Sequence, residues 1–230
     1  MASKFFNERM RLADIIMVNH NIILLLPRFG IPLGFADKSI EEVCRKYDVS
    51  ADFMVQICNV YTFEDYHIDE EDLKHLDMRM LVPYLLASHR YYTEERLPHI
   101  EAHLMRIADS VEPKYGTVLK SFFADYRKEI DEHFRCEEEF DFPNLENLQR
   151  GVKPKVSMSS HYEESHTDLV DKLNDLPQIV YKYLPGNVLP EETMELVFDI
   201  LQLSADIQKH ALVEDKILLP YISIMERELA

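Results

Sequence analysis

The sequence predicts an all-α protein, an up-down-up-down four-helix bundle with a small N-terminal helical domain. Only 5 glycines occur among 230 residues, and no stretch shows the sustained alternation that is typical of a strand. Four long amphipathic segments, at roughly 78–110, 115–141, 159–184 and 190–228, are separated by short breaks that contain proline. Connections this short favour antiparallel neighbours, and a hydrophobic content of 47% is enough for one sizeable core.

Residues 1–66 are predicted to form the small N-terminal domain, and residues 67–230 the bundle. In the N-terminal domain an apolar helix ends near Pro27, and a turn follows around FGIPLGFADKS. The acidic stretch HIDEEDLKH at the boundary is a linker or the start of a helix.

Two serines mark the starts of the next two helices of this domain. Ser39 and Ser50 are both placed to cap a helix, the first with Glu42 three residues later as a capping box. A helix, a short turn and a second helix also make up a DNA-contacting motif, so a regulatory protein is one alternative. The charge of this stretch is close to balance, which disfavours that alternative.

The formal net charge of -17 argues against a partner that is a nucleic acid or an anionic membrane surface. The short apolar run IILLL follows Asn21 and precedes a proline, so it is neither a signal peptide nor long enough to span a bilayer. We therefore expect a cytoplasmic protein. Cys44, Cys58 and Cys136 form no C-x-x-C pair, which favours reduced thiols that behave as small buried side chains.

Two stretches, HFRCEEEFDFP from residue 133 and HALVEDKILLP from residue 210, share the pattern H-x3-E-x5-P. In both, histidine and glutamate interrupt an apolar stripe at helical spacing, and a proline is expected to close the segment. The first stripe is Leu119, Phe122, Tyr126, Ile130, His133, Glu137 and Phe140, and the second is Leu203, Ile207, His210, Glu214 and Ile217.

A lone histidine precedes each motif by 44 residues, so that both halves of the bundle repeat with an offset of 77. Side chains at i and i+4 share one helix face, and buried glutamates would each cost several kcal/mol unless cations compensate them. The pattern therefore predicts a dinuclear metal site, with the two glutamates as bridges and room for an oxo or hydroxo bridge. Imidazole with carboxylate suits iron, although manganese or zinc fits the same ligands. The six candidate ligands are His89, His133, Glu137, His166, His210 and Glu214.

A structural interpretation of these residues stays open beside the metal site. In that interpretation the histidines are satisfied core residues and the glutamates reach solvent, as we expect for Glu138 and Glu139. His99 and His103 are also spaced i, i+4 and are interpreted as part of a solvated face or as a second cation site.

Three stretches, HFRCEEEFDFP, EESHTDL and HALVEDKILLP, resemble the hemerythrin-like HHE cation-binding domain, and within it the repair-of-iron-centres family of di-iron proteins, the YtfE and ScdA type. The resemblance covers nearly the whole chain and implies two non-haem iron ions held by the six residues. It also implies the repair of iron-sulfur clusters under nitrosative or oxidative stress, with damaged iron-sulfur proteins as partners and a small diatomic ligand, oxygen or nitric oxide.

The N-terminal stretch RFGIPLGFADKSIEEVCRKYDVS is similar to the small domain of that family but lacks its paired cysteines. When Gly30, Ile31 and Lys38 are aligned, the pair falls on Gly34 and Phe35. The alternative function is thus an oxygen, nitric oxide or iron binding or sensing protein without repair activity, and whether the protein is an enzyme is left open. An apolar helix expected to be exposed at 22–26 motivates a homodimer through this domain.

Overall fold

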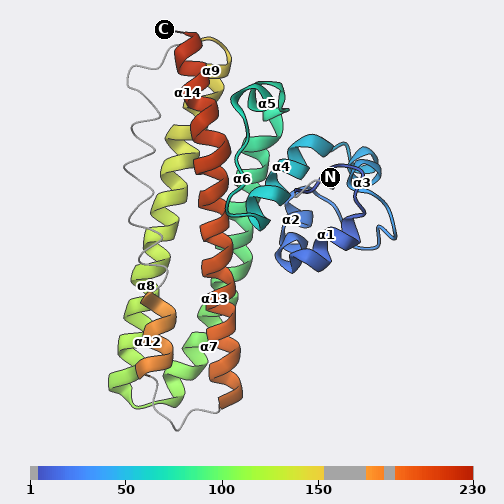
Figure 1. Ribbon diagram of the computed structural model, residues 1–230. Helices are drawn as coiled ribbons and strands as arrows, with labels where there is room; N and C mark the ends of the chain where they lie inside the picture. The colour runs from blue at the N-terminus through green and yellow to red at the C-terminus, as the bar shows by residue number, and fades with distance from the viewer. Residues whose placement is uncertain (1–4, 153–174, 184–189, 230) are drawn as a thin grey trace. The chain divides into compact units, whose positions relative to one another are not determined.

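The computed structural model describes residues 5–152, 175–183 and 190–229 (Figure 1). These residues form helices joined by short connections, and an isolated antiparallel bridge pairs Arg11 with Ser39. The all-α prediction, with long helices packed as a bundle and an N-terminal helical region, is confirmed. The packing divides the chain into two compact units, Met1–Ser88 with Lys209–Ala230, and His89–Gln208. The domain boundary after residue 66 stays a prediction.

The first unit opens with short helices. They are α1 (Leu12–Val18), the 3-10 turn η1 (His20–Leu24), α2 (Leu25–Arg28), α3 (Ile40–Tyr47), α4 (Ala51–Thr62), α5 (Glu70–His75) and the 3-10 turn η2 (Met78–Met80). Asn19 interrupts the apolar helix expected before Pro27, because its side chain accepts the backbone N–H of Asn21 and starts a new turn. The capping box of Ser39 and Glu42 is confirmed, as is the cap that Ser50 provides to α4.

The apolar run at 22–26 faces the interior. Ile22, Leu25 and Leu26 are buried, while Ile23 has an exposed fraction of 40%. The expectation of an exposed apolar helix is therefore wrong, because the 3-10 turn η1 and the short helix α2 direct most of its side chains into the core. This argument for a homodimer is therefore lost. The homodimer stays a prediction, and measurement of the mass of the protein in solution tests it.

The C-terminal part of the first unit is tied to its N-terminal part by polar contacts. The Nζ atom of Lys216 donates to the carbonyl oxygens of Glu64 and Tyr66, both at 2.8 Å. Arg227 pairs with Glu70 on α5 at 2.7 Å. These contacts attach the segment that follows Glu214 to the connection between α4 and α5.

The second unit contains most of the long helices, and α6 (Leu81–Arg90) leads into it from the first unit, whose N-terminal part ends at Ser88. Helix α6 continues through the π-turn η3 (Tyr91–Arg96) into α7 (Leu97–Ser110), and α8 (Pro113–Cys136) continues through η4 (Glu137–Asp141) into α9 (Phe142–Gln149). Its other described elements are α12 (Asp175–Tyr183) and most of α13 (Pro190–Val213). The last long helix runs on through η5 (Glu214–Leu218) into α14 (Leu219–Glu228). The core includes Tyr92, Leu104, Phe123, Ile130, Leu196 and Ile207.

At the turn between α7 and α8 a glycine allows a close backbone approach. A Cβ atom at Gly116 would lie 2.2 Å from the carbonyl oxygen of Ala108. The two helices can therefore approach at this point only with glycine on α8.

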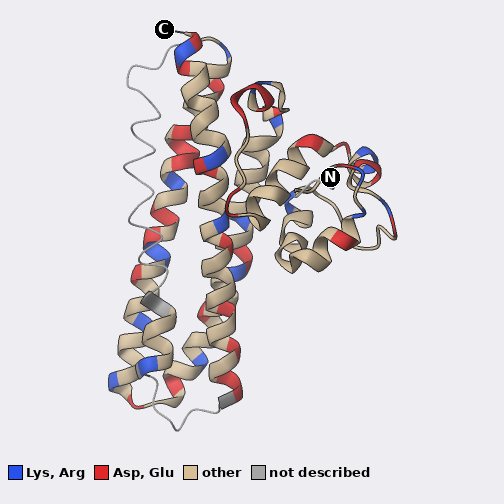
Figure 2. Ribbon diagram, in the orientation of Figure 1, with Lys and Arg blue, Asp and Glu red and all other residues tan. Residues whose placement is uncertain are grey.

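Charged residues of both signs are interspersed along the long helices (Figure 2). Buried or half-buried pairs such as Arg96 with Asp199, at 2.9 Å, link neighbouring helices of the second unit. Among the described residues, no helix combines the length and the apolar character that crossing a membrane requires.

Candidate metal centre

The described candidate ligands lie near places where an α-helix passes into a π-turn. His89 is near the end of α6, and η3 begins two residues later. His133 lies in the last turn of α8, and Glu137 is the first residue of η4. In the second motif, His210 lies in the last turn of α13, and Glu214 is the first residue of η5. π-turns of this kind are rare and occur frequently at functional sites.

A proline follows each π-turn and explains it. A proline inside a helix has no N–H, and its ring collides with the carbonyl group four residues earlier. Pro98, Pro143 and Pro220 each stand at the second position of the helix after the turn. The expectation that Pro143 and Pro220 close their helices is therefore wrong, because the wider turn makes room for the ring and the helix continues.

The wider turn also changes which residues face the core. A π-turn holds one residue more than an α-turn, so later side chains lie about one residue's rotation behind the α-helical register. Phe140, expected on the buried stripe, has an exposed fraction of 58%, whereas Asp141 and Phe142 are buried. The expectation for Phe140 is wrong for this reason.

Glu137 presents its two carboxylate oxygens to two histidines. Its Oε2 atom lies 3.2 Å from Nε2 of His89, and its Oε1 atom lies 3.2 Å from Nε2 of His133. In the second motif, Oε1 of Glu214 lies 3.2 Å from Nε2 of His210. The i, i+4 spacing thus places histidine and carboxylate side by side in both motifs.

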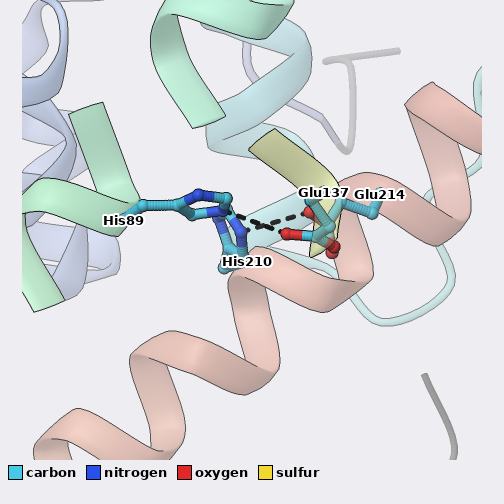
Figure 3. Close-up of side chains that lie close together, drawn as sticks. All are labelled: His89, Glu137, His210 and Glu214. Carbon is cyan, nitrogen blue, oxygen red and sulfur yellow. Dashed lines mark ion pairs between the residues drawn. The ribbon is translucent and has the colours of Figure 1, made fainter. Parts of the chain in front are cut away.

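Four buried residues can together offer ligand atoms to one metal ion. They are His89, Glu137, His210 and Glu214, whose ligand atoms all lie within 4.8 Å of one another. Figure 3 shows the two imidazole rings directed at the two carboxylates. Each of the four has an exposed fraction of 2% or less. Imidazole nitrogen with carboxylate oxygen is a donor set that suits iron, manganese and zinc, so these residues fit a metal ion.

The remaining histidines that the sequence singled out differ in how their positions agree with the predictions. The His133 side chain is 13% exposed and adjoins Glu137, outside the group of four. His166 lies outside the described residues. His99 is exposed beside Asp199, whereas His103 is buried, so the expectation of a solvated face is wrong for His103.

Sequence reasoning missed two kinds of neighbour around His89. The ring of Phe134 stacks on the His89 ring with centroids 4.0 Å apart, and the Phe142 ring lies 5.6 Å away. Glu138, expected to reach solvent, instead places Oε1 at 2.8 Å from Nδ1 of His89. Pro143 is the feature of the sequence from which the turn that brings Phe142 inward could have been predicted. The contact between Glu138 and His89 joins residues 49 positions apart, so no local pattern in the sequence indicates it.

The model of the hemerythrin HHE cation binding domain matches residues 80–222. The chain belongs to the hemerythrin HHE cation-binding family. The matched region contains all six candidate ligands that the sequence predicts, from His89 to Glu214. The family thereby accounts for the histidine and glutamate pattern as a metal site.

Similar proteins carry the name of a repair protein. The chain is 25% identical over 185 residues to the iron-sulfur cluster repair protein ScdA of Staphylococcus haemolyticus, covering 78% of this chain and 82% of that protein. It is 24% identical over 158 residues to the ScdA protein of Staphylococcus epidermidis, covering 65% of this chain and 69% of that protein. This distant similarity extends the match beyond the HHE domain to most of the chain.

Proposed function

We propose that the chain is a non-haem di-iron protein of the repair-of-iron-centres type. The observation that carries the proposal is the buried group of His89, Glu137, His210 and Glu214 inside an HHE cation-binding domain. His133 adjoins Glu137, and His166 corresponds to His89 by the offset of 77 residues. With these two residues the ligand set has six members, three from each half.

The contacts of Glu137 support a bridging role. Its two oxygens face different histidines, as a carboxylate would if it joined two metal ions. We assign the same role to Glu214 from the repeated motif. Bound iron would supply a change of redox state and a coordination position for oxygen or nitric oxide.

The protein side chains control access to this site. The aromatic rings of Phe134 and Phe142 pack against His89, whose exposed fraction is 1%. Such packing keeps bulk water away from the His89 ring. The proposed biological role is the repair of iron-sulfur clusters damaged by nitrosative or oxidative stress, which the names of the ScdA relatives support.

Metal content tests the centre directly. The chain is purified without oxygen, loaded with Fe(II), and compared with His133→Ala and Glu214→Gln by metal analysis and Mössbauer spectroscopy. We expect about two irons per native chain with coupled spectra after oxidation, and loss of this signal in both variants. Glu195→Gln, which removes an exposed carboxylate from α13, is the control and should load normally. Manganese or zinc in preference to iron would revise the metal assignment.

The second candidate function is reversible binding or sensing of oxygen, nitric oxide or iron without repair. The sequence favours it at Gly34 and Phe35, which stand where the relatives' family has its cysteine pair. Iron-loaded protein is therefore mixed with a nitric-oxide-damaged iron-sulfur dehydratase whose activity is followed. Recovery with the native chain and none with Glu214→Gln supports repair. Full iron loading with reversible nitric oxide binding but no recovery supports sensing.

A further inference from the structure

Two consecutive residues of η4 hold both ring nitrogens of His89. Nε2 lies 3.2 Å from Oε2 of Glu137, and Nδ1 lies 2.8 Å from Oε1 of Glu138. A carboxylate can only accept a hydrogen bond, so Nδ1–H of His89 is the donor to Glu138. When Nε2, the atom that faces Glu137 and the proposed centre, binds a metal ion, the one proton of the neutral ring is therefore on Nδ1.

The surroundings of the two partners differ sharply. His89 is buried, and its ring is stacked with Phe134 at 4.0 Å and an interplanar angle of 13°. The Glu138 side chain keeps an exposed fraction of 42%. Glu138 therefore reaches from the surface to a ring whose rotation is already limited by aromatic packing.

We propose that Glu138 is a positioning residue of the metal centre. It fixes the tautomer and direction of His89, and it makes Nε2 a stronger donor to a metal ion. Glu138 acts through His89, because its carboxylate engages the nitrogen that faces away from Glu137. This inference rests on the proposed function, since it requires His89 to bind a metal ion. At the corresponding place of the second half, 77 residues later, the sequence also has a carboxylate, Asp215.

The first test measures the affinity of the metal-free full chain for Fe(II), without oxygen, against a coloured chelator. Glu138→Ala should bind Fe(II) about 10- to 100-fold more weakly than the native chain, as is usual when such an outer partner is lost. Glu138→Gln keeps an acceptor oxygen without the charge and should lose less. The matched control is Glu139→Ala, which removes the neighbouring exposed carboxylate and should leave the affinity unchanged.

Two further measurements separate positioning from a structural role. Metal-free Glu138→Ala removes the acceptor of a buried N–H and should unfold at a somewhat lower temperature, whereas metal-free Glu138→Gln keeps an acceptor and should unfold at the native temperature. In the metal-free chain, NMR should show the Nδ1–H proton of His89 in a hydrogen bond, and Glu138→Ala should lose this signature.

The outcomes distinguish this inference from the function on which it rests. A native chain that binds Fe(II) beside a Glu138→Ala variant of equal affinity overturns the inference alone. Weaker binding by Glu138→Ala that Glu138→Gln does not partly restore, together with a lower unfolding temperature of both metal-free variants, assigns Glu138 a structural role and also overturns the inference. A native chain that binds no Fe(II) overturns both proposals.

Discussion

The backbone N–H of Phe142 donates to the carbonyl oxygen of Glu137, five residues earlier in the chain. This bond is the π-turn that begins at a candidate ligand, and the same bond joins Leu219 to Glu214 in the second motif. Because a proline follows each donor, the turn is a consequence of the sequence, and the orientation of the carboxylate depends on it.

Replacement of Pro143 by alanine should weaken metal binding. The new N–H at position 143 can bond to the carbonyl group of Glu139, so the π-turn is no longer required. A return to the α-helical register would turn Asp141 and Phe142 away from their buried positions. We expect at least about a tenfold loss of Fe(II) affinity, by the usual effect of disturbing an outer partner of a metal site.

The control for this substitution is Pro113→Ala, at the first position of α8, where the missing N–H is not needed. It should leave Fe(II) affinity unchanged. A crystal structure of Pro143→Ala shows whether the π-turn remains. A lost π-turn with native affinity would show that the turn does not orient Glu137.

Glu214→Gln should stabilise the metal-free chain at neutral pH while abolishing its stabilisation by metal. Glu214 has an exposed fraction of 0%, and its contact with Nε2 of His210 at 3.2 Å offsets only part of the cost of burying a carboxylate, so we expect a gain of about 1–3 kcal/mol in the free energy of unfolding. With Fe(II) at a hundred times its dissociation constant, the native chain should instead gain about 2.7 kcal/mol. Urea unfolding with a chelator and with Fe(II) measures both.

Glu195→Gln on α13 is exposed and should change neither quantity by more than about 0.5 kcal/mol. A metal-free Glu214→Gln chain that is less stable than the native one would mean that hydrogen bonds in the core stabilise the carboxylate. A metal ion would then not be needed to offset its burial.

Gly116→Ala should destabilise the bundle and leave the metal site intact. The added Cβ would lie 2.2 Å from the carbonyl oxygen of Ala108, and this backbone atom can move only with its helix. We expect a loss of about 1–3 kcal/mol, reduced by the better helix propensity of alanine. Urea unfolding tests it, and Ala124→Gly on an exposed position of the same helix measures the propensity contribution, about 1 kcal/mol. A variant as stable as the native chain would show that the two helices can separate at no cost.

The stability of the chain should fall at alkaline pH in a way that depends on Cys44. Burial raises the pKa of the Cys44 thiol from 9.0 to about 12, and burial also raises the pKa of Cys58. Between pH 9 and about pH 12 the Cys44 thiol therefore loses its proton in the unfolded chain and keeps it in the folded chain. The stabilisation is therefore complete below about pH 9 and is lost as the pH rises toward 12.

Urea unfolding of the native chain and of Cys44→Ala at several pH values measures this effect. The native free energy of unfolding should fall more steeply above pH 9, by about 1.4 kcal/mol per pH unit. Below pH 8 the difference between the two chains should be constant, since only the lost packing remains. Parallel curves throughout would contradict a protonated buried thiol.

The sequence predicted those features that depend on local periodicity. The helix stripes, the cap at Ser39, and the proximity of Glu137 to His133 and of Glu214 to His210 all follow from spacing along one helix. The break at Asn19 was missed because its side chain competes with the backbone, which hydrophobic patterning does not register.

From the π-turns onward the same periodicity predicted the buried face of the helix wrongly. A period of 3.6 residues assigned Phe140 to the core, and the wider turn reversed this assignment. The partnership of Glu138 with His89 joins different helices, so only the folded arrangement reveals it. His166 keeps its place in the ligand set by the repeat alone.

Each π-turn also lets a helix hold one additional residue while the side chains before and after the turn keep their buried positions. A residue inserted into a regular helix turns everything beyond it by roughly 100° and carries buried side chains to the surface. The wider turn between Glu137 and Phe142 absorbs the surplus residue locally, so Leu145 and Leu148 remain buried. When this chain is aligned with helices that lack the turn, a one-residue gap therefore belongs within 138–141, and the two flanking segments then superpose in register.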